Sequence, residues 1–369
     1  MRVALVHDWL TGFRGGEKVL HELARMFPQA DLYTLIRVPG SVSPEIERLH
    51  IHVSPLSSLP GAARHYRKLL PLFPWAIERF QLHGYDLVIS TSHSFAKGVR
   101  VAPGTPHLCY CFTPIRYAWD LADEYLGRGA KRLVAAPLLS YLRRWDRRTS
   151  SPARVTQVVA ISRTIADRVR RVWGREASVV FPGVDVARFA RREPRPGEFF
   201  FMLGGFVPYK AEALAIEAFR RTGQSLVLAG DGPTRAALEK MAPPNVRFLG
   251  RVSDTELEDL YARCRALVYP QLEDFGIIAV EAQAAGKPVI ALGKGGAAET
   301  VVGPNDPEGR APTGLFFAEP TPESLERALR AFDELEPKLE PQAIRAHAAR
   351  FSLENFRAGI AREIEKVLR

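Results

Sequence analysis

Cysteine is scarce in this chain, and its positions exclude a disulfide framework and the common zinc and thiol-redox motifs. The 369 residues include only three cysteines, Cys109, Cys111 and Cys264. A single residue separates Cys109 from Cys111 within an apolar run, which is not a metal-ligand or redox spacing. We therefore expect these two to be buried, reduced thiols, as in a cytoplasmic protein.

Long apolar runs and metal-ligand clusters are missing as well. Nothing approaches the roughly 18 consecutive apolar residues of a membrane span. The chain opens directly on an apolar strand pattern at residues 3–6, without the features of a secretory signal. His, Asp and Glu residues form no cluster with metal-ligand spacing, and no nucleophile elbow is present. We therefore expect no metal ion, no separate cofactor and no serine nucleophile.

Acidic residues are fewer than basic ones: the chain has 41 Asp and Glu and 51 Lys and Arg, which gives a net charge of +10. This excess predicts an anionic partner. The chain has no aromatic-rich stacking motif and no recognition-helix signature, so we do not expect nucleic acid. Much of the positive charge falls in residues 64–75 and 131–148, mixed with Leu, Phe and Trp. Such segments are equally typical of a peripheral contact with an anionic membrane and of an amphipathic helix packed on a sheet.

Strand and helix signals alternate along the chain in two successive runs. In the first half, strands are predicted at residues 3–8, 31–36, 86–90, 107–112, 157–162 and 178–181, and helices at 16–26, 131–148 and 163–173. A charged, proline-containing linker follows at 191–197. In the second half, strands are predicted at 199–203, 226–229, 246–249, 266–269, 289–292 and 314–317, with helices that begin near residues 213, 234, 254, 277, 297 and 322.

This double alternation predicts an α/β fold with two doubly wound, Rossmann-like parallel sheets that face each other across a cleft. The length suits two domains, and 46% hydrophobic with 25% charged residues is ordinary for a globular enzyme. The predicted domains are residues 1–190 and 191–351. An amphipathic helix follows at 352–369, with Ser352 as its N-cap.

The segment between Glu273 and Glu281 is the most informative part of the sequence. It follows an apolar strand, Gly276 breaks the backbone, and a helix begins near Ile277 and ends before Gly286. A helix N-terminus offers unpaired N–H groups to an anion, and carboxylates can hold sugar hydroxyls. Because open α/β sheets bind ligands beyond the carboxyl ends of their strands, this context predicts a nucleotide-sugar site. The spacing of the two glutamates alone would be weak evidence.

Other candidate binding residues lie in the connections between a predicted strand and the helix that follows it. Lys210 follows the first strand of the second half, where an ammonium group can contact a diphosphate. Gly15 and Gly16 allow the backbone to approach a phosphate, although a tight turn explains them equally well. His93 and Arg116 each lie just past a strand and could touch either substrate, with a packing role favoured for His93.

Taken together, these segments resemble the retaining family 4 glycosyltransferases, whose two facing Rossmann-like domains form the GT-B architecture. The resemblance spans essentially the whole chain. It is closest to a subgroup often described as mannosyltransferases of surface-polysaccharide assembly, and it rests on residues 6–12 (VHDWLTG), 15–18 (GGEK), 109–114 (CYCFTP), 116–120 (RYAWD) and 207–210 (VPYK).

The resemblance implies roles for individual residues. Glu281 would bind the nucleotide ribose, Glu273 would hold the hydroxyls of the donor sugar, and Lys210 would stabilise the diphosphate. The sugar and phosphate would be lined by the backbone amides of Phe275, Gly276 and Ile277.

Further implications concern the nucleotide base and the end of the chain. The loop that contains Arg251 and Val252 would lie against the base. The C-terminal helix would return to the first domain, as it does in relatives.

Two departures from the subgroup pattern are visible. A histidine usually stands where this chain has Phe112, on the acceptor side. An arginine commonly stands at Gly205 or at Ala211, and its loss could cost a few kcal/mol of leaving-group stabilisation. Arg251 or Arg116 are the residues that could compensate.

The predicted function is metal-independent transfer of a hexose, with mannose as the first candidate, from a GDP- or UDP-linked donor to a polysaccharide or lipid-linked acceptor. The configuration at the sugar would be retained by reaction on one face, and the protein would be cytoplasmic or peripheral on the inner face of the membrane. Two alternatives stay open: an epimerase or hydrolase that acts on nucleotide sugars, and a non-catalytic, nucleotide-sugar-binding partner subunit. Turnover of the donor would separate the enzymes from the partner subunit.

Overall fold

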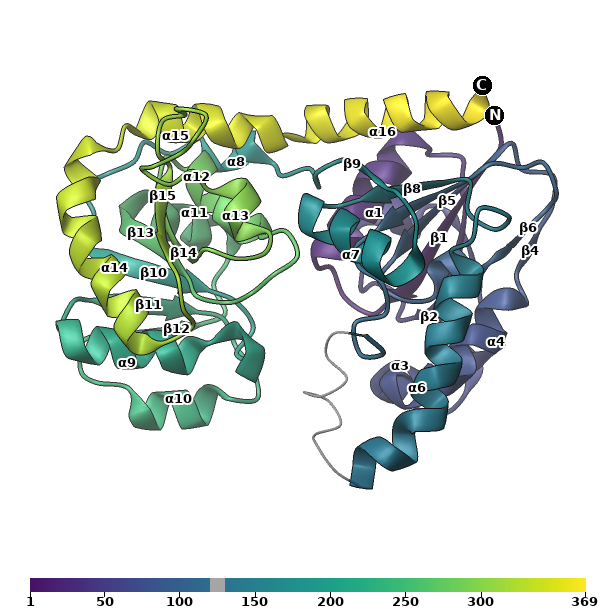
Figure 1. Ribbon diagram of the computed structural model, residues 1–369, viewed down its shortest axis with the longest axis horizontal. Coiled ribbons are helices and arrows are strands. Elements are labelled where there is room, and N and C mark those ends of the chain that lie inside the picture. Colours follow the sequence, from purple (N-terminus) through teal and green to yellow (C-terminus); the bar gives the residue numbers. More distant parts are fainter. Residues whose placement is uncertain (120–129) are drawn as a thin grey trace. The chain divides into compact units, whose positions relative to one another are not determined.

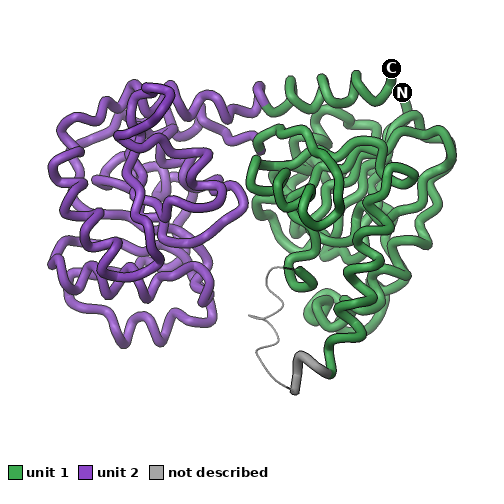
Figure 2. The backbone as a smooth tube through the Cα atoms, in the orientation of Figure 1, with its two compact units in different colours: residues 1–181, 356–369 green, residues 182–355 purple. Residues whose placement is uncertain are grey.

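The structure is a computed structural model that describes residues 1–119 and 130–369, without the side chains of residues 130–133. Asp120, and the side chains of Lys131, Arg132 and Leu133, therefore lie outside the described part. The chain divides into two compact units (Figure 2). Unit 1 comprises residues 1–181 and 356–369, and unit 2 comprises residues 182–355.

Unit 1 is built on a seven-stranded sheet with the order β3-β2-β1-β5-β7-β8-β9, in which all neighbours run parallel. Its strands are β1 (Val3–Leu10), β2 (Asp31–Arg37), β3 (His50–Val53), β5 (Leu87–Ser92), β7 (His107–Cys111), β8 (Gln157–Ala160) and β9 (Ser178–Val179). A separate two-stranded sheet pairs β4 (Gln81–Leu82) with β6 (Arg100–Val101). The strand order reverses between β1 and β5, which is where doubly wound sheets bind ligands.

Both faces of this sheet are covered, so β1 is apolar and buried along almost its whole length. The covering helices appear in Figure 1 around the sheet of unit 1. The helices of unit 1 are α1 (Gly15–Met26), α2 (Pro44–Glu47), α3 (Ala62–His65), α4 (Phe73–Glu78), α6 (Ala130–Thr149), α7 (Arg163–Trp173) and most of α16 (Leu353–Leu368), with short 3-10 segments at Pro55–Ser58, Tyr66–Leu72 and Ala96–Gly98.

Helix α6 is fixed to unit 1 by a buried ion pair. Lys97 Nζ lies 2.7 Å from Asp146 Oδ1, and neither side chain is accessible to solvent. The indole N–H groups of Trp119 and Trp173 both donate to Asp146 Oδ2, at 2.8 Å each. Asp146 is thus surrounded by donors, which offsets the cost of burying its charge.

The terminal helix α16 contacts four elements of unit 1. Arg357 pairs with Glu22 of α1 at 2.7 Å, and the Phe356 ring packs edge-on against Tyr110 of β7 at 5.7 Å between centroids. Glu363 accepts hydrogen bonds from residues of β8 and β9. The helix begins after Ser352, whose hydroxyl accepts from the N–H of Asn355 at 3.3 Å, so the predicted N-cap is confirmed.

Unit 2 has a six-stranded parallel sheet with the order β12-β11-β10-β13-β14-β15. Its strands are β10 (Phe199–Leu203), β11 (Leu226–Ala229), β12 (Val246–Gly250), β13 (Cys264–Tyr269), β14 (Val289–Leu292) and β15 (Gly314–Phe317). The order reverses between β10 and β13, so the switch point of unit 2 lies between the strands that precede Lys210 and Glu273.

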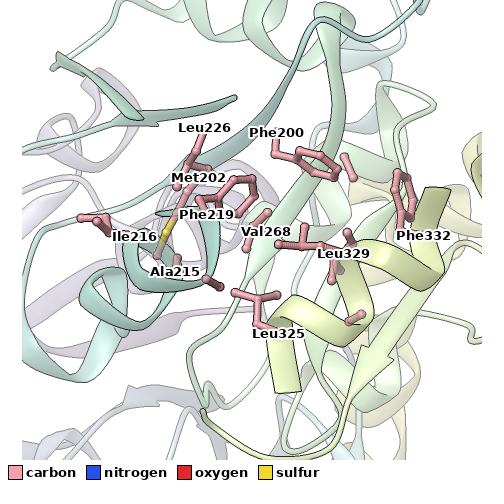
Figure 3. Packing of buried hydrophobic residues seen from close by; sticks show 14 of the residues in the cluster. Phe200, Met202, Ala215, Ile216, Phe219, Leu226, Val268, Leu325, Leu329 and Phe332 are labelled. Carbon is pink, nitrogen blue, oxygen red and sulfur yellow. The ribbon is translucent and has the colours of Figure 1, made fainter. Parts of the chain in front are cut away.

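Adjacent residues of β10 point to opposite faces, and each face has its own core. Phe200 packs with Phe219 and Phe332 in the cluster shown in Figure 3. Phe201 packs edge-on against Tyr261, on the other face. The helices of unit 2 are α8 (Val186–Phe189), α9 (Glu212–Thr222), α10 (Arg235–Met241), α11 (Asp254–Arg263), α12 (Ile277–Ala284), α13 (Ala297–Thr300), α14 (Pro322–Leu335) and α15 (Pro341–Ala348), with 3-10 segments at Pro208–Lys210, Glu336–Lys338 and Ala349–Phe351.

The predicted α/β class and both parallel sheets are confirmed, and each predicted strand overlaps an observed one. The prediction missed β3 and the two-stranded sheet, which are short. All three cysteines are buried and free, as expected for Cys109 and Cys111. Among the described residues, no helix combines the length and the apolarity needed to cross a membrane.

Candidate functional site

The loop that links β13 to α12 depends on glycine at position 276. Gly276 has φ +95° and ψ +58°, a left-handed conformation that side chains with a Cβ disfavour. A Cβ at this position would also approach the Tyr269 hydroxyl to 3.1 Å. Gly276 therefore turns the chain directly into α12, whose first residue is the half-buried Ile277. The first N–H groups of an α-helix generally have no intrahelical acceptor and can bind an anion.

Glu273 is held by a partner at each carboxylate oxygen. Its Oε1 forms an ion pair with Lys210 Nζ, and its Oε2 accepts a hydrogen bond from the Tyr269 hydroxyl at 2.9 Å. Burial, together with Glu273, raises the pKa of Tyr269 well above its usual value, so the hydroxyl remains a donor. Lys210 is 17% exposed and Glu273 is 27% exposed, which leaves both within reach of a ligand. The structure thus brings together two residues that are 63 positions apart in sequence.

Glu281 lies on α12 and is almost fully buried, at 3% exposure. The hydroxyl of Tyr261 donates to its Oε2 at 3.2 Å. Burial and the nearby Glu281 carboxylate raise the pKa of Tyr261 well above its usual value. A carboxylate that is oriented in this way is suited to accept hydrogen bonds from a polar ligand.

A second glycine turn supports the loop of Glu273. The N–H of Gly296 donates to the Glu273 carbonyl at 2.8 Å. A Cβ on Gly295, which has φ +67°, would lie 2.6 Å from that carbonyl oxygen. A Cβ on Gly296 would lie 2.3 Å from the Cα of the buried Phe275. The sequence Gly295-Gly296 is therefore required by close packing of two loops.

The segment after β10 contains Gly205 and Ala211, the two positions at which the subgroup pattern commonly has an arginine and this chain does not. Around Gly205 a Cβ would meet only the Asp231 carbonyl, at 3.8 Å, so the space for a larger side chain exists. Ala211 is the one described residue other than glycine with a positive φ, +59°. Arg251 is 87% exposed, and its ion-pair partner among the described residues is Asp231, at 3.9 Å. It thus lies on the loop after β12, beside the half-buried Val252.

Glu212, the first residue of α9, is a residue that the sequence analysis missed. Its side chain is 3% exposed, and its Oε1 has no hydrogen-bond partner within the described structure. Desolvation raises its pKa to about 7, even though Lys210 nearby opposes this shift. A glutamate at a helix start is too common to be distinguished by sequence alone.

In unit 1, the glycine turn after β1 makes room for an imidazole. A Cβ on Gly16 would lie 2.5 Å from His93 Cε1 and 2.7 Å from its Nε2. Gly15 is the first residue of α1. The sequence predicted that these glycines admit a phosphate, and in the structure the group nearest to Gly16 is His93.

Asp8, at the carboxyl end of β1, organises the turn that holds His93. Its two carboxylate oxygens accept the backbone N–H groups of residues 93 to 96 at 2.6–3.0 Å. Burial by itself would raise the pKa of Asp8, but His93, His7 and these N–H groups outweigh it and lower the pKa below its usual value. His93 Nδ1 lies 3.5 Å from Asp8 Oδ2. A fully buried carboxylate therefore stays charged behind the imidazole.

Aromatic rings flank His93, whose side chain is 32% exposed. Phe112 stacks on it at 4.3 Å between centroids, and Trp9 lies parallel at 6.1 Å. Phe112 thus replaces the histidine of the subgroup pattern with an apolar wall. Arg116 is half-buried in the turn that follows β7.

A cavity of about 660 Å³ lies against α6. Three arginines line it, and two of them, Arg143 and Arg147, stack over the Trp119 ring at 5.4 Å and 4.8 Å. The lining residues are Trp119, Ala136, Leu139, Ser140, Arg143, Arg144 and Arg147. Such a surface favours an anionic group beside apolar material.

Comparison with protein families assigns both halves of the chain. Residues 13–188 match the model described as Glycosyltransferase Family 4, and residues 184–349 match the model described as Glycosyl transferases group 1. The two matches meet near the boundary between unit 1 and unit 2.

Curated relatives align with part of the chain. A glycogen synthase of Mycobacterium tuberculosis is 33% identical over an alignment of 162 residues that covers 39% of this chain and 39% of that protein. A GDP-mannose-dependent alpha-(1-6)-phosphatidylinositol monomannoside mannosyltransferase of the same organism is 33% identical over an alignment of 175 residues that covers 39% of this chain and 46% of that protein. The chain therefore spans less than half of the length of these relatives.

Solved structures match over the whole length. The crystal structure of HepE from Anabaena in complex with UDP is 18% identical, has a TM-score of 0.70, and covers 99% of this chain and 100% of that chain. At this identity the likeness concerns the fold.

Proposed function

This chain belongs to family 4 of the glycosyltransferases, and on that premise we propose that it transfers a hexose from a nucleotide diphosphate sugar to a saccharide or lipid-linked acceptor, with retention of configuration. The observation that carries the proposal is the ion pair between Lys210 and Glu273, which lies where the strand order of unit 2 reverses. The neighbouring N-terminus of α12 adds N–H groups suited to a phosphate.

The Lys210–Glu273 pair suggests how the donor would be bound. A diphosphate offers Lys210 a more highly charged partner than one carboxylate, so Lys210 would turn to the leaving group. Glu273 would then accept hydrogen bonds from the sugar hydroxyls, while Tyr269 continues to hold its second oxygen. Glu281, oriented by Tyr261, would accept the ribose hydroxyls.

The chemical step follows from these roles. The bond between the anomeric carbon and the donor's phosphate oxygen breaks, and the acceptor hydroxyl bonds to the same face of that carbon. The hydroxyl proton passes to a phosphate oxygen of the departing nucleoside diphosphate. Unlike a retaining glycosidase, this route requires no pair of protein carboxylates. Lys210 and the α12 amides would stabilise the developing charge without a metal ion.

We propose mannose from a GDP-linked donor as the first pairing to test, with UDP-linked donors second. The support is similarity: one relative is a GDP-mannose-dependent mannosyltransferase, and one structural neighbour was solved with UDP. Because these similarities concern part of the chain or the fold alone, both nucleotides belong in the first experiment.

On the acceptor side we propose His93 as a contact for the acceptor or the sugar. The buried Asp8 behind it holds a negative charge 3.5 Å from Nδ1, which favours a proton on that nitrogen and leaves Nε2 to accept a hydrogen bond. The rings of Phe112 and Trp9, both roughly parallel to the imidazole, hold it in place. We propose Arg116 as a second contact for the acceptor or the sugar, and Gly15 and Gly16 as the place where the backbone approaches the donor's phosphate.

We also propose a peripheral contact with an anionic membrane through residues 64–75 and α6. Leu72 and Trp75 are 47% and 51% exposed, and Val134 and Tyr141 on α6 are 83% and 47% exposed. Basic residues accompany both apolar groups, and the arginine-lined cavity on α6 suits a phosphate headgroup. Pelleting with vesicles of phosphatidylglycerol and phosphatidylcholine tests this, since Leu72→Ser with Trp75→Ser should weaken binding. Binding that ignores salt and lipid charge would contradict it.

The test of the transfer function begins with nucleotide binding. Thermal melting with GDP, UDP, ADP and dTDP should show stabilisation by one nucleotide, about 2.7 kcal/mol at a concentration 100 times its dissociation constant. Lys210→Met and Glu281→Gln should each abolish the shift, and the exposed Lys240→Met should retain it. Incubation with the matching donor sugar and an acceptor extract, followed by NMR of the product, should show the donor's anomeric configuration.

The outcomes separate the alternatives. Stabilisation without any donor turnover would favour a partner subunit, and an altered free sugar nucleotide would indicate an epimerase. If no nucleotide shifts the melting temperature, the proposed function is wrong.

A further inference from the structure

Two histidines and one aspartate meet at the starting end of strands β2 and β3 in unit 1. These strands are parallel, and their register pairs Asp31 with His50 and Tyr33 with His52. Because His50 and His52 are two residues apart on one strand, their side chains lie on the same side of the sheet. The sequence shows no cluster with metal-ligand spacing, but the register of these two strands brings three possible ligands together.

The three side chains point their ligand atoms at one another. His50 Nδ1 lies 3.0 Å from Asp31 Oδ1, and His52 Nε2 lies 3.6 Å from the same oxygen. All three ligand atoms lie within 4.8 Å of one another. Metal–ligand bonds of roughly 2.0–2.2 Å in a tetrahedron separate ligand atoms by about 3.4 Å, which is close to the separations of 3.0 Å and 3.6 Å that the two imidazoles have from Asp31 Oδ1.

We propose that Asp31, His50 and His52 form a site for one divalent transition-metal ion of the zinc class, with solvent in the remaining coordination position. Two imidazole nitrogens and one carboxylate oxygen suit zinc, cobalt, nickel or copper better than magnesium or calcium, which prefer oxygen ligands alone. The exposed fractions of the side chains, 22% for Asp31, 74% for His50 and 34% for His52, leave the site open to an ion from solvent.

A hydrogen bond holds the second carboxylate oxygen of Asp31, as is usual for carboxylates that bind metal ions. The Tyr85 hydroxyl donates to Asp31 Oδ2 at 2.6 Å, which directs Oδ1 toward the two imidazoles. The Tyr33 hydroxyl lies 2.7 Å from that of Tyr85, and because Tyr85 gives its proton to Asp31, Tyr33 donates to Tyr85. The Tyr33 ring stacks on His52 at 4.4 Å, which fixes that imidazole.

Arg2 is the cation that could compete with a metal ion. Its Nη2 lies 4.0 Å from Asp31, on Oδ2 and not on the oxygen that faces the histidines. The side chain is 68% exposed and stacks on the Tyr85 ring at 5.1 Å. Arg2 therefore leaves Oδ1 open. Without a metal ion, the same three ligands make an ordinary hydrogen-bonded cluster, with His50 donating to Asp31.

The site would have a structural role and not a catalytic one. It joins the edge strand β3 to β2 at their starting ends, whereas Asp8 lies near the carboxyl end of β1 and His93 directly follows β5. A bound ion would stabilise the sheet edge, and it would do so whether or not the chain transfers sugars.

Calorimetric titration of the full chain with zinc chloride tests the proposal. The protein carries no histidine tag, is stripped of metal and is kept at about pH 7.5, because protons compete with a metal ion for its ligands. We expect one zinc ion per chain, a melting temperature that rises with zinc, and the visible spectrum of tetrahedral cobalt when Co²⁺ is used. His50→Ala and His52→Ala should each weaken zinc binding at least about tenfold, while the exposed His83→Ala should leave it unchanged.

Two results would overturn the proposal: no heat and no cobalt spectrum with the unmodified chain, or equal zinc binding by the double variant His50→Ala, His52→Ala. His50 is largely exposed, so its variant should fold normally, and thermal melting without zinc checks this. Nucleotide binding measured on the same variants should be unchanged, which keeps this test independent of the transfer function.

Discussion

Replacement of Glu212 by glutamine should change how the stability of the chain depends on pH. Glu212 is buried at the start of α9, and desolvation raises its pKa from 4.5 to about 7. The folded protein therefore binds this proton more tightly than the unfolded chain does. The resulting stability is fully present below the unfolded pKa of 4.5, and it is lost as the pH rises through about 7.

The size of the effect follows from the difference between these pKa values. Each pKa unit corresponds to about 1.4 kcal/mol, so a rise from 4.5 to about 7 amounts to roughly 3 kcal/mol. Most of this loss falls between pH 5 and pH 8. Glu212→Gln keeps the shape of the side chain and removes the titration, so the variant should be about as stable as the parent near pH 5 and more stable near pH 8.

Urea unfolding at several pH values between about 5 and 8 measures this difference. The slope against pH is the decisive quantity, because the new amide could add a constant offset that does not vary with pH. Glu334→Gln, which alters an exposed carboxylate of the same unit, is the matched control and should follow the parent. If the free energy of unfolding changes with pH in the same way for the parent and for Glu212→Gln, the reasoning is refuted.

Three further substitutions test the packing of the site and of its support. Gly276→Ala should destabilise the chain by about 1–2 kcal/mol in urea unfolding, and more than Gly40→Ala, which has a similar backbone conformation but open surroundings. Gly16→Ala should cost about 1–3 kcal/mol through its collision with His93; a cost no larger than that of Gly12→Ala would contradict the close contact. Lys97→Met should cost about 3–5 kcal/mol because it leaves Asp146 buried without its partner, and addition of Asp146→Asn should restore part of that loss in the same measurement.

The sequence was most informative where the signals are local. The strand, glycine and helix around Gly276 could be predicted because each depends on a few neighbouring residues. The Ser352 cap is of the same kind, and it was confirmed. The roles of Glu273, Glu281 and Lys210 in donor binding stay predictions, although the ion pair shows that two of them meet.

The features that the sequence could not predict depend on contacts between distant segments. The backbone donors that surround Asp8 come from residues 85 to 88 positions away, and the sequence around Asp8 does not predict these contacts. The metal-ligand cluster requires the register of β2 and β3, and β3 itself is a short, half-exposed edge strand with the polar pattern HIHV. The raised pKa of Glu212 comes from burial, which a helix start does not reveal.

The division of the chain has a consequence for its synthesis. Unit 2 is one continuous stretch, residues 182–355, whereas unit 1 is closed only by residues 356–369. Because a ribosome delivers the chain from its N-terminus, unit 2 can be completed while unit 1 still lacks α16. Until then Glu22, buried in the finished unit, has no Arg357, and Tyr110 has no Phe356 against it. The half of the protein that is made first is therefore the half that is finished last.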